Sequence, residues 1–334
     1  MLRFVVRRLL QLVPVLFGLS VLLFVWVRML PGDPARALLG RHATPSSLAQ
    51  VRAQLGLDKS LPEQYLAYLS SLLSGDLGRS ISDGRPVTES FFDKLPATLQ
   101  LAGVALLIAV LVGIPLGYLA ARHQGKWFDT VLVSGSLIGV VTPVFFLAIL
   151  LRLVFADWLH WLPTGGQQDP RLDATHLTNF YVLDGLLTRE WDAAWDALLH
   201  LVLPGIALGT MAMAYIARIT RASVIEVLGE DYVRTARSKG LADVTVSWRH
   251  ILRNALLPVV TTLGLLAGAL LSGAVLTETV FSFSGIGEYL FAAISTRDYP
   301  VIQGFVLLIA VFYTLINLAV DLAYGFIDPR VRVS

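Results

Sequence analysis

Cysteine is absent from the 334 residues of this sequence, which excludes disulfide bonds, iron–sulfur clusters and thiol catalysis. Charged residues are scarce: they make up 15% of the chain, against about 25% in soluble domains. Hydrophobic residues make up 55%. A soluble core of this length cannot bury so much apolar surface, so the composition predicts a protein inserted in a membrane. The formal net charge of +2 gives no indication of a nucleic-acid partner.

Sequence motifs of common nucleotide-binding, metal and protease sites are also missing. There is no G-x-x-x-x-G-K-[ST] loop to hold ATP phosphates and no H-E-x-x-H metal motif. The Ser284-Gly285 pair is not preceded by the Gly-x that an intramembrane serine protease would need in G-x-S-G. We therefore expect no catalytic residue, no cofactor and no metal site, and a protein that is not an enzyme. Any ATP that drives it should be hydrolysed by a separate subunit.

Six apolar stretches approach the ~20 residues with which a helix crosses the hydrocarbon core of a bilayer. The first lies within 1–30 and follows a basic start, and no A-x-A site comes after it, so we predict an uncleaved membrane helix. The other five are predicted at 98–121, 131–156, 198–218, 257–277 and 302–324. The predicted fold class is an all-α polytopic membrane protein with six transmembrane helices.

The polar segment 31–97 follows the first span. Partial apolar stripes after Thr44 and Pro62, ended by Gly56 and Gly75, predict two short helices. The segment is therefore predicted to be folded and helical, and not a flexible linker.

The positions of Lys and Arg set the orientation in the membrane. About half of the 26 Lys and Arg residues lie in the N-terminal tail, the turn after 121, the loop 219–256 and the tail 325–334. These parts are together much shorter than the polar segments 31–97 and 157–197. Because the bias counts most in short loops, we predict that both termini are cytoplasmic and that 31–97 and 157–197 are extracytoplasmic.

The longest polar run on the predicted inner side, 226–258, carries the signals of two short helices. Asp231 can cap a helix that ends near Lys239, and Gly240 suits the left-handed position that terminates it. A second, amphipathic helix is predicted from Asp243. The apolar stripe predicted for that second helix is Val244, Trp248, Ile251 or Leu252, and Ala255.

Two interpretations of this loop stay open. A basic amphipathic helix beside a membrane can lie on the anionic lipid surface. Alternatively, a short helix can insert into a groove of a soluble partner. The sharp corner at Gly240 favours the partner, because lipid binding needs only one helix.

The ionisable residues inside the predicted spans bear on whether a proton or sodium gradient drives the protein. The ionisable residues there, Arg28, Arg152, Glu278 and Asp321, lie near span ends, where snorkelling or capping at the interface explains them. A proton- or sodium-coupled carrier usually has carboxylates deep in the bundle, and no internal repeat is visible. A self-sufficient secondary carrier or channel for small solutes is the alternative, and a membrane scaffold without transport is a third possibility.

Glycines spaced four residues apart occur in several spans. Such pairs let helices approach closely, and packing within one subunit is favoured over a contact between subunits. The pairs are Gly113/Gly117, Gly135/Gly139, Gly205/Gly209 and Gly264/Gly268.

The loop resembles the signature loop of type I ABC importer permeases, in which a glycine follows a short helix and a leucine–proline pair comes later. Arg234-Thr235-Ala236 stands where Glu-Ala-Ala is typical, and the glycine-to-proline spacing is longer. Both departures are typical of the peptide/nickel subfamily, and within it the chain is most similar to the first permease subunit of dipeptide transporters. The stretches that carry the resemblance are DYVRTARSKGL at 231–241, RHILRNALLPVV at 249–260, PGDP at 31–34, GDLGRS at 75–80, TETVFSFSGIGE at 277–288, RDYP at 297–300 and YGFIDPR at 324–330.

The resemblance implies a type I importer fold with an ABC transmembrane domain over 94–327. It implies a permease that moves dipeptides or oligopeptides across the bacterial cytoplasmic (inner) membrane by alternating access. The implied partners are a second homologous permease, two ATP-binding subunits on the cytoplasmic side and an extracytoplasmic peptide-binding protein. The coupling contact with an ATP-binding subunit is implied for Asp231, Tyr232, Arg234, Ala236, Arg237 and Gly240. The subfamily also includes carriers of glutathione, nickel complexes and haem, and nothing in the sequence marks a pocket for one of them.

Overall fold

A computed structural model describes residues 2–29, 44–54, 56–172 and 174–327. These residues are helical with connecting loops, and in them the only extended pairing is an isolated bridge between Arg79 and Pro86. The PGDP cluster at 31–34 and the C-terminal tail from 328 lie outside the described residues. The chain divides into two compact units, Met1–Leu95 with Gly285–Ser334 and Pro96–Ser284.

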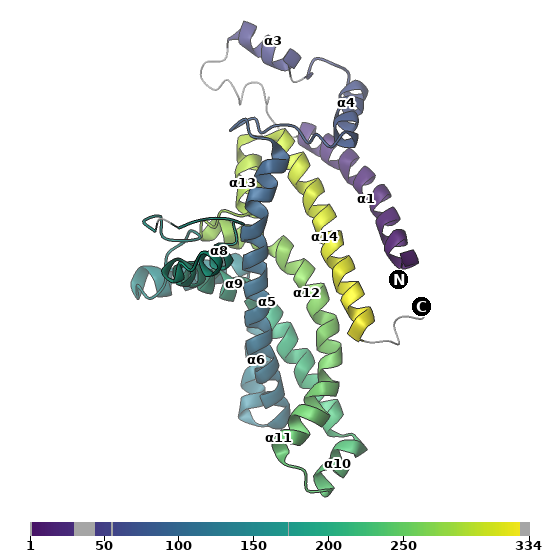
Figure 1. The fold of residues 1–334 in the computed structure, drawn as a ribbon, viewed down its shortest axis with the longest axis vertical. Helices are drawn as coiled ribbons and strands as arrows, with labels where there is room; N and C mark the ends of the chain where they lie inside the picture. The colour runs from purple at the N-terminus through teal and green to yellow at the C-terminus, as the bar shows by residue number, and fades with distance from the viewer. Residues whose placement is uncertain (1, 30–43, 55, 173, 328–334) are drawn as a thin grey trace. The chain divides into compact units, whose positions relative to one another are not determined.

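The larger unit is a bundle of helices around α9 (Trp191–Leu228), which is drawn in teal and green in Figure 1. Its core consists of side chains such as Leu101, Leu208 and Phe283, all at most 3% exposed. The helices packed against α9 are the part of α5 (Val87–Arg122) after Leu95, α6 (Trp127–Val141), α7 (Val144–Leu151), α8 (Tyr181–Thr188) and α12 (Arg253–Val280).

Glycines bring the backbones of α5 and α9 together inside this unit. A Cβ on Gly117 would overlap the carbonyl oxygen of Ala217, and one on Gly209 would lie 2.7 Å from the carbonyl oxygen of Ala105. These positions therefore pack within the chain, as the spacing predicts. By contrast, a Cβ on Gly135 would meet no atom of the described chain within 4 Å.

The third predicted span, 131–156, is broken into two helical segments. α6 ends at Val141 and α7 begins at Val144, and the two segments are bent by 104°. The break falls at Thr142-Pro143: proline has no N–H to donate, and Thr142 adopts an extended conformation (φ −68°, ψ 124°). The described chain therefore has five helices long and apolar enough to span a membrane, or up to six if the bent pair is one span.

The other helices run past the predicted spans. α9 covers Trp191–Leu228 where 198–218 was predicted, and α5 begins at Val87, inside the segment predicted as 31–97. The helical stretch that contains the fifth span begins at Asp243 and not at 257. Hydropathy marks only the most apolar part of each helix, because its polar ends contribute nothing to the apolar window.

The smaller unit contains α1 (Leu2–Met29) and α14 (Tyr299–Ile327), which lie side by side and run antiparallel (Figure 1). This arrangement brings the start of α1 and the end of α14 to the same end of the unit. Short helices complete it: α3 (Pro45–Gln54), α4 (Leu61–Leu73), which packs on α1, and α13 (Ile286–Thr296), which packs on α14. The two helices predicted within 31–97 are thus present as α3 and α4.

The GDLGRS and RDYP stretches, more than 200 residues apart, meet in this unit. The Ser80 hydroxyl donates to Oδ2 of Asp298 at 2.6 Å, and the Ser82 amide donates to the same oxygen at 3.1 Å. A Cβ on Gly78 would lie 3.3 Å from Cβ of Pro300. Asp298 is 1% exposed, and a buried carboxylate requires such donors. The contact fixes the loop before α5 on the loop before α14.

Candidate functional site

The candidate site is α10 (Asp231–Ser238) with the turn that follows it, at the end of the larger unit where α5 ends (Figure 1). Val233 and Ala236 are 0% and 5% exposed, while the other six residues of α10 are exposed. Because residues three apart share one face of a helix, α10 has one buried edge and one open face.

The buried edge of α10 docks on the ends of the bundle helices. Val233 and Ala236 belong to an apolar cluster that we call the docking cluster. Its other buried members are Ala121 from α5, Val224 and Val227 from α9, Val246, Ile251 and Leu252 from the turns before α12, and Ala255 from α12 itself. α10 is therefore packed directly against the ends of α5, α9 and α12.

The end of α10 is a glycine-dependent cap. Gly240 has φ +75°, its amide donates to the Arg237 carbonyl at 2.9 Å, and the Leu241 amide donates to the Ala236 carbonyl at 3.3 Å. This pair of bonds is a Schellman motif with glycine at the left-handed C′ position. A Cβ on Gly240 would meet no described atom within 4 Å, so the backbone conformation and not lack of space favours glycine.

Polar contacts tie the turn after α10 to the bundle. Arg122 Nη2 at the end of α5 pairs with Asp243 Oδ2 at 2.9 Å. The Tyr118 hydroxyl donates to Ser247 Oγ at 2.6 Å. Asn254 Nδ2 donates to the Tyr232 hydroxyl at 2.9 Å. Each of these bonds crosses between elements, so they limit how far α10 and its turn can rotate.

A second brace holds the turn between α5 and α6. Arg221 of α9 binds Asp129 through two bonds, Nε to Oδ1 at 2.5 Å and Nη2 to Oδ2 at 2.8 Å, and the Gly125 amide donates to Oδ2 at 3.0 Å. Asp129 is 5% exposed, which makes the two-pronged pairing necessary as well as strong. Sequence reasoning missed this pair because its partners lie 92 residues apart. The only sequence signal was an acidic residue in a short basic turn.

Of the six residues predicted for the coupling contact, five are exposed in the structure and one is buried. Tyr232, Arg234 and Arg237 lie on the open face, and Asp231 and Gly240 are exposed as well. Ala236 is placed elsewhere: it packs in the docking cluster and faces the bundle.

Two local predictions are wrong. Glu230, not Asp231, occupies the N-cap position. The predicted stripe of the second helix also fails in part, because Val244 and Trp248 are 70% and 68% exposed while Ala255 is buried. The turns of Val246–Leu252 (η3) are π-helical, with hydrogen bonds between residues five apart, so the spacing of an α-helical stripe does not continue through them.

Of the ionisable residues in the spans, Glu278 is held inside the protein. It is 0% exposed, and the Thr98 hydroxyl donates to its Oε1 at 2.6 Å. Arg152 Nη1 donates to the Val280 carbonyl at 2.6 Å, which fixes the bent third span on the end of α12. The side chain of Asp321 lies outside the described residues. In the described chain, no group of three or more His, Asp or Glu residues is placed to hold a metal ion.

Comparisons with known proteins place the chain in a family of transport proteins. The family of inner membrane components of binding-protein-dependent transport systems matches residues 113–333, and the family describing the N-terminal part of such components matches 1–102. The chain therefore belongs to the binding-protein-dependent transport system permeases, and it is an all-α polytopic membrane protein.

Particular relatives match over the whole length. The chain is 44% identical over 332 residues to the dipeptide transport system permease protein DppB of Alkalihalophilus pseudofirmus, covering 99% of this chain and 100% of the relative. It is 40% identical over 332 residues to the glutathione transport system permease protein GsiC of Escherichia coli, covering 99% of each. A solved structure of the inward-facing MetNI methionine ABC transporter contains a chain with a TM-score of 0.51 and 15% identity, covering 70% of this chain and 93% of that one. That likeness shows a shared fold.

Proposed function

We propose that this chain is one permease subunit of an ATP-driven importer that moves dipeptides or oligopeptides across the bacterial cytoplasmic membrane. The observation that carries the proposal is the docked α10, which has an open, basic outer face and a buried edge on three helix ends. The relatives named for dipeptide and glutathione transport support small peptides as the substrate class. The bias of Lys and Arg toward the loop 219–256 supports a cytoplasmic position for α10, with both termini on the same side.

In this proposal α10 is the coupling element. One of two separate ATP-binding subunits receives the open face, and the arginines at 234 and 237 meet acidic groups on its rim. Closure of these subunits on ATP pushes α10. The docking cluster and the Arg122–Asp243 pair pass the movement to the bundle, which switches between inward and outward arrangements with a second, homologous permease. Segments 31–97 and 157–197 face a soluble peptide-binding protein outside the cell.

The subunit requirement can be tested in liposomes. Liposomes that hold only this chain should take up no labelled dipeptide, with or without a proton or sodium gradient. Liposomes that hold the complete complex, purified from its native host, should take it up when ATP and the loaded binding protein are supplied. Gradient-driven uptake by the chain alone would instead establish a self-sufficient carrier.

Replacing Gly240 by valine should uncouple ATP hydrolysis from uptake. A β-branched residue at φ +75° costs about 1–3 kcal/mol in backbone strain, which the cap of α10 relieves by unwinding. We expect normal amounts of the variant in the membrane, but several-fold less peptide transported per ATP hydrolysed by the purified complex. Gly240→Asn is the matched control, because asparagine tolerates the left-handed conformation. Full transport by Gly240→Val would remove the coupling role from this turn.

A further inference from the structure

The short helix α4 is attached to the last turns of the membrane-spanning helix α1, although it belongs to a segment predicted to lie outside the membrane. The rings of Tyr65 and Tyr68 pack on the ring of Phe24 in α1, at centroid distances of 5.1 and 6.0 Å. Further along α1, Arg28 Nε donates to Gln64 Oε1 at 2.9 Å. These contacts place the middle of α4 beside the end of α1.

The level of α4 in the membrane follows from the span that it contacts. The candidate span in α1 is Leu10–Met29. At about 1.5 Å per residue, Phe24 lies roughly 8 Å inside the end of that span. The hydroxyls of Ser20 and Tyr65, 3.1 Å apart, meet deeper still. Trp26 is 41% exposed and has the side chain most typical of the boundary between hydrocarbon and headgroups. α4 therefore lies at this boundary and not out in the aqueous phase.

One face of α1 changes from exposed to buried where α4 begins. Val13, Phe17, Ser20 and Phe24 are three or four residues apart and so share this face. Val13 and Phe17 are 63% and 54% exposed, whereas Ser20 and Phe24 are 2% and 5% exposed where α4 packs. The exposed part belongs to a membrane-spanning helix and lies in the hydrocarbon layer. α4 thus borders a lipid-facing surface.

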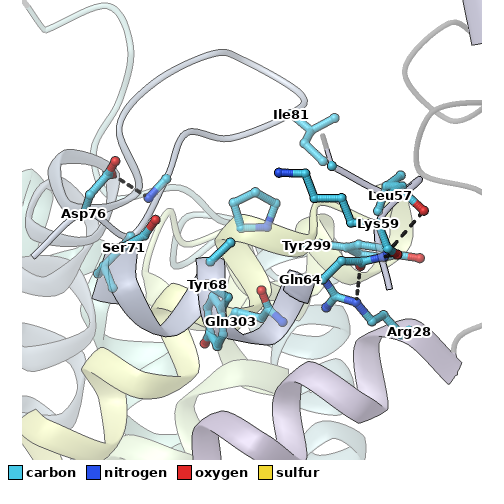
Figure 2. Close-up of a pocket in the computed structure, with 15 residues that line it drawn as sticks. Arg28, Leu57, Lys59, Gln64, Tyr68, Ser71, Asp76, Ile81, Tyr299 and Gln303 are labelled. Carbon is cyan, nitrogen blue, oxygen red and sulfur yellow. Dashed lines mark hydrogen bonds between the residues drawn. The ribbon is translucent and has the colours of Figure 1, made fainter. Parts of the chain in front are cut away.

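The two free sides of α4 differ in polarity. One side lines a cavity of about 430 Å³ (Figure 2) through Ser71, together with the exposed and charged Lys59 and Asp76, which require water. At about 100° per residue, Leu66 and Leu73 lie roughly opposite Ser71. They are 63% and 82% exposed. An apolar side opposite a polar side is typical of helices that lie in the plane of the membrane interface.

We propose that the side of α4 with Leu66 and Leu73 inserts among the lipid chains of the leaflet at the C-terminal end of α1. The bilayer is the occupant of this side because the side continues the lipid-facing surface of α1. The cavity side stays in water. The segment 31–97 therefore offers a soluble partner only its other surfaces. This inference rests on the membrane-spanning fold and not on the transport function proposed above.

Single-cysteine variants test the orientation of α4, because the chain has no cysteine of its own. The variants are Leu66→Cys, Leu73→Cys and, as the matched control on the cavity side of the same helix, Ser71→Cys. Each is assembled with cysteine-free partner subunits and placed, without a binding protein, in nanodiscs of phosphatidylcholine and phosphatidylglycerol. One measurement is the rate of modification by a membrane-impermeant maleimide. The other is quenching of an attached fluorophore by lipids that carry a nitroxide near the headgroup.

Positions 66 and 73 should be modified about tenfold more slowly than position 71, because an apolar environment raises the pKa of a thiol and one pKa unit removes nine-tenths of the reactive thiolate. Their fluorophores should be quenched several-fold more strongly by the nitroxide lipid. Equal rates and equal quenching at all three positions would place both sides of α4 in water and overturn the proposal. Slow modification without quenching at 66 and 73 would show that another subunit covers the leucines, which would overturn it as well.

Discussion

Replacing Val233 by aspartate should abolish peptide uptake without preventing insertion into the membrane. Val233 is 0% exposed and packs among the apolar side chains of the docking cluster. An unpaired buried carboxylate costs about 3–5 kcal/mol, which changes the ratio of docked to undocked α10 by roughly 100-fold or more. Since the spans are untouched, the energetic loss falls on the docking of α10. Uptake of a labelled dipeptide, normalised to the amount of chain in the membrane, measures the effect.

The matched control for this change is Val244→Asp. Val244 carries the same side chain on the same loop but is 70% exposed, so a carboxylate there stays hydrated. We expect the control to retain most of the uptake. If Val244→Asp lost as much as Val233→Asp, added negative charge on the loop and not undocking would explain the loss. Unimpaired uptake by Val233→Asp would show that docking of α10 does not matter for transport.

The parts of the site that the sequence predicted are the local ones. A left-handed residue after a short helix has a local signature, so the glycine at position 240 could be assigned before the structure was known. Which face of α10 is buried depends on helices more than a hundred residues distant, such as α5 with Ala121. For that reason Ala236 was placed in the contact with the partner although it faces the bundle. The Asp129–Arg221 pair was missed for the same reason.

For the fold as well, the features set by nearby residues were predicted, and those set by contacts between distant residues were not. The apolar runs of about 20 residues predicted the positions of the long apolar helices, because the thickness of the bilayer sets the length of a spanning helix. They did not predict the 104° bend at Thr142-Pro143, since a proline within an apolar run can be kinked, tolerated or terminal depending on its neighbours. Nor did they predict the burial of Glu278, which depends on how α12 packs against α5.

Replacing Gly117 by valine should destabilise the folded chain more than any other glycine replacement discussed above. A Cβ at Gly117 would overlap the Ala217 carbonyl oxygen and lie 2.7 Å from Cβ of Thr220. The neighbour is the backbone of α9, which cannot rotate away as a side chain can, so the helices must separate. Overpacking typically costs about 1–3 kcal/mol, and more where backbone has to shift. We expect a lower midpoint of thermal unfolding in detergent and little accumulation in the membrane.

The comparison that isolates the clash is Gly103→Val on the same helix. A Cβ on Gly103 would meet no described atom within 4 Å, yet the replacement makes the same change in helix propensity and adds the same volume. Gly103→Val should therefore accumulate and unfold like the unchanged protein. Similar losses in both variants would mean that valine is poorly tolerated anywhere in α5. A loss confined to position 117 would show that α5 and α9 pack at backbone distance, which the bundle needs if it is to move as a unit when α10 is pushed.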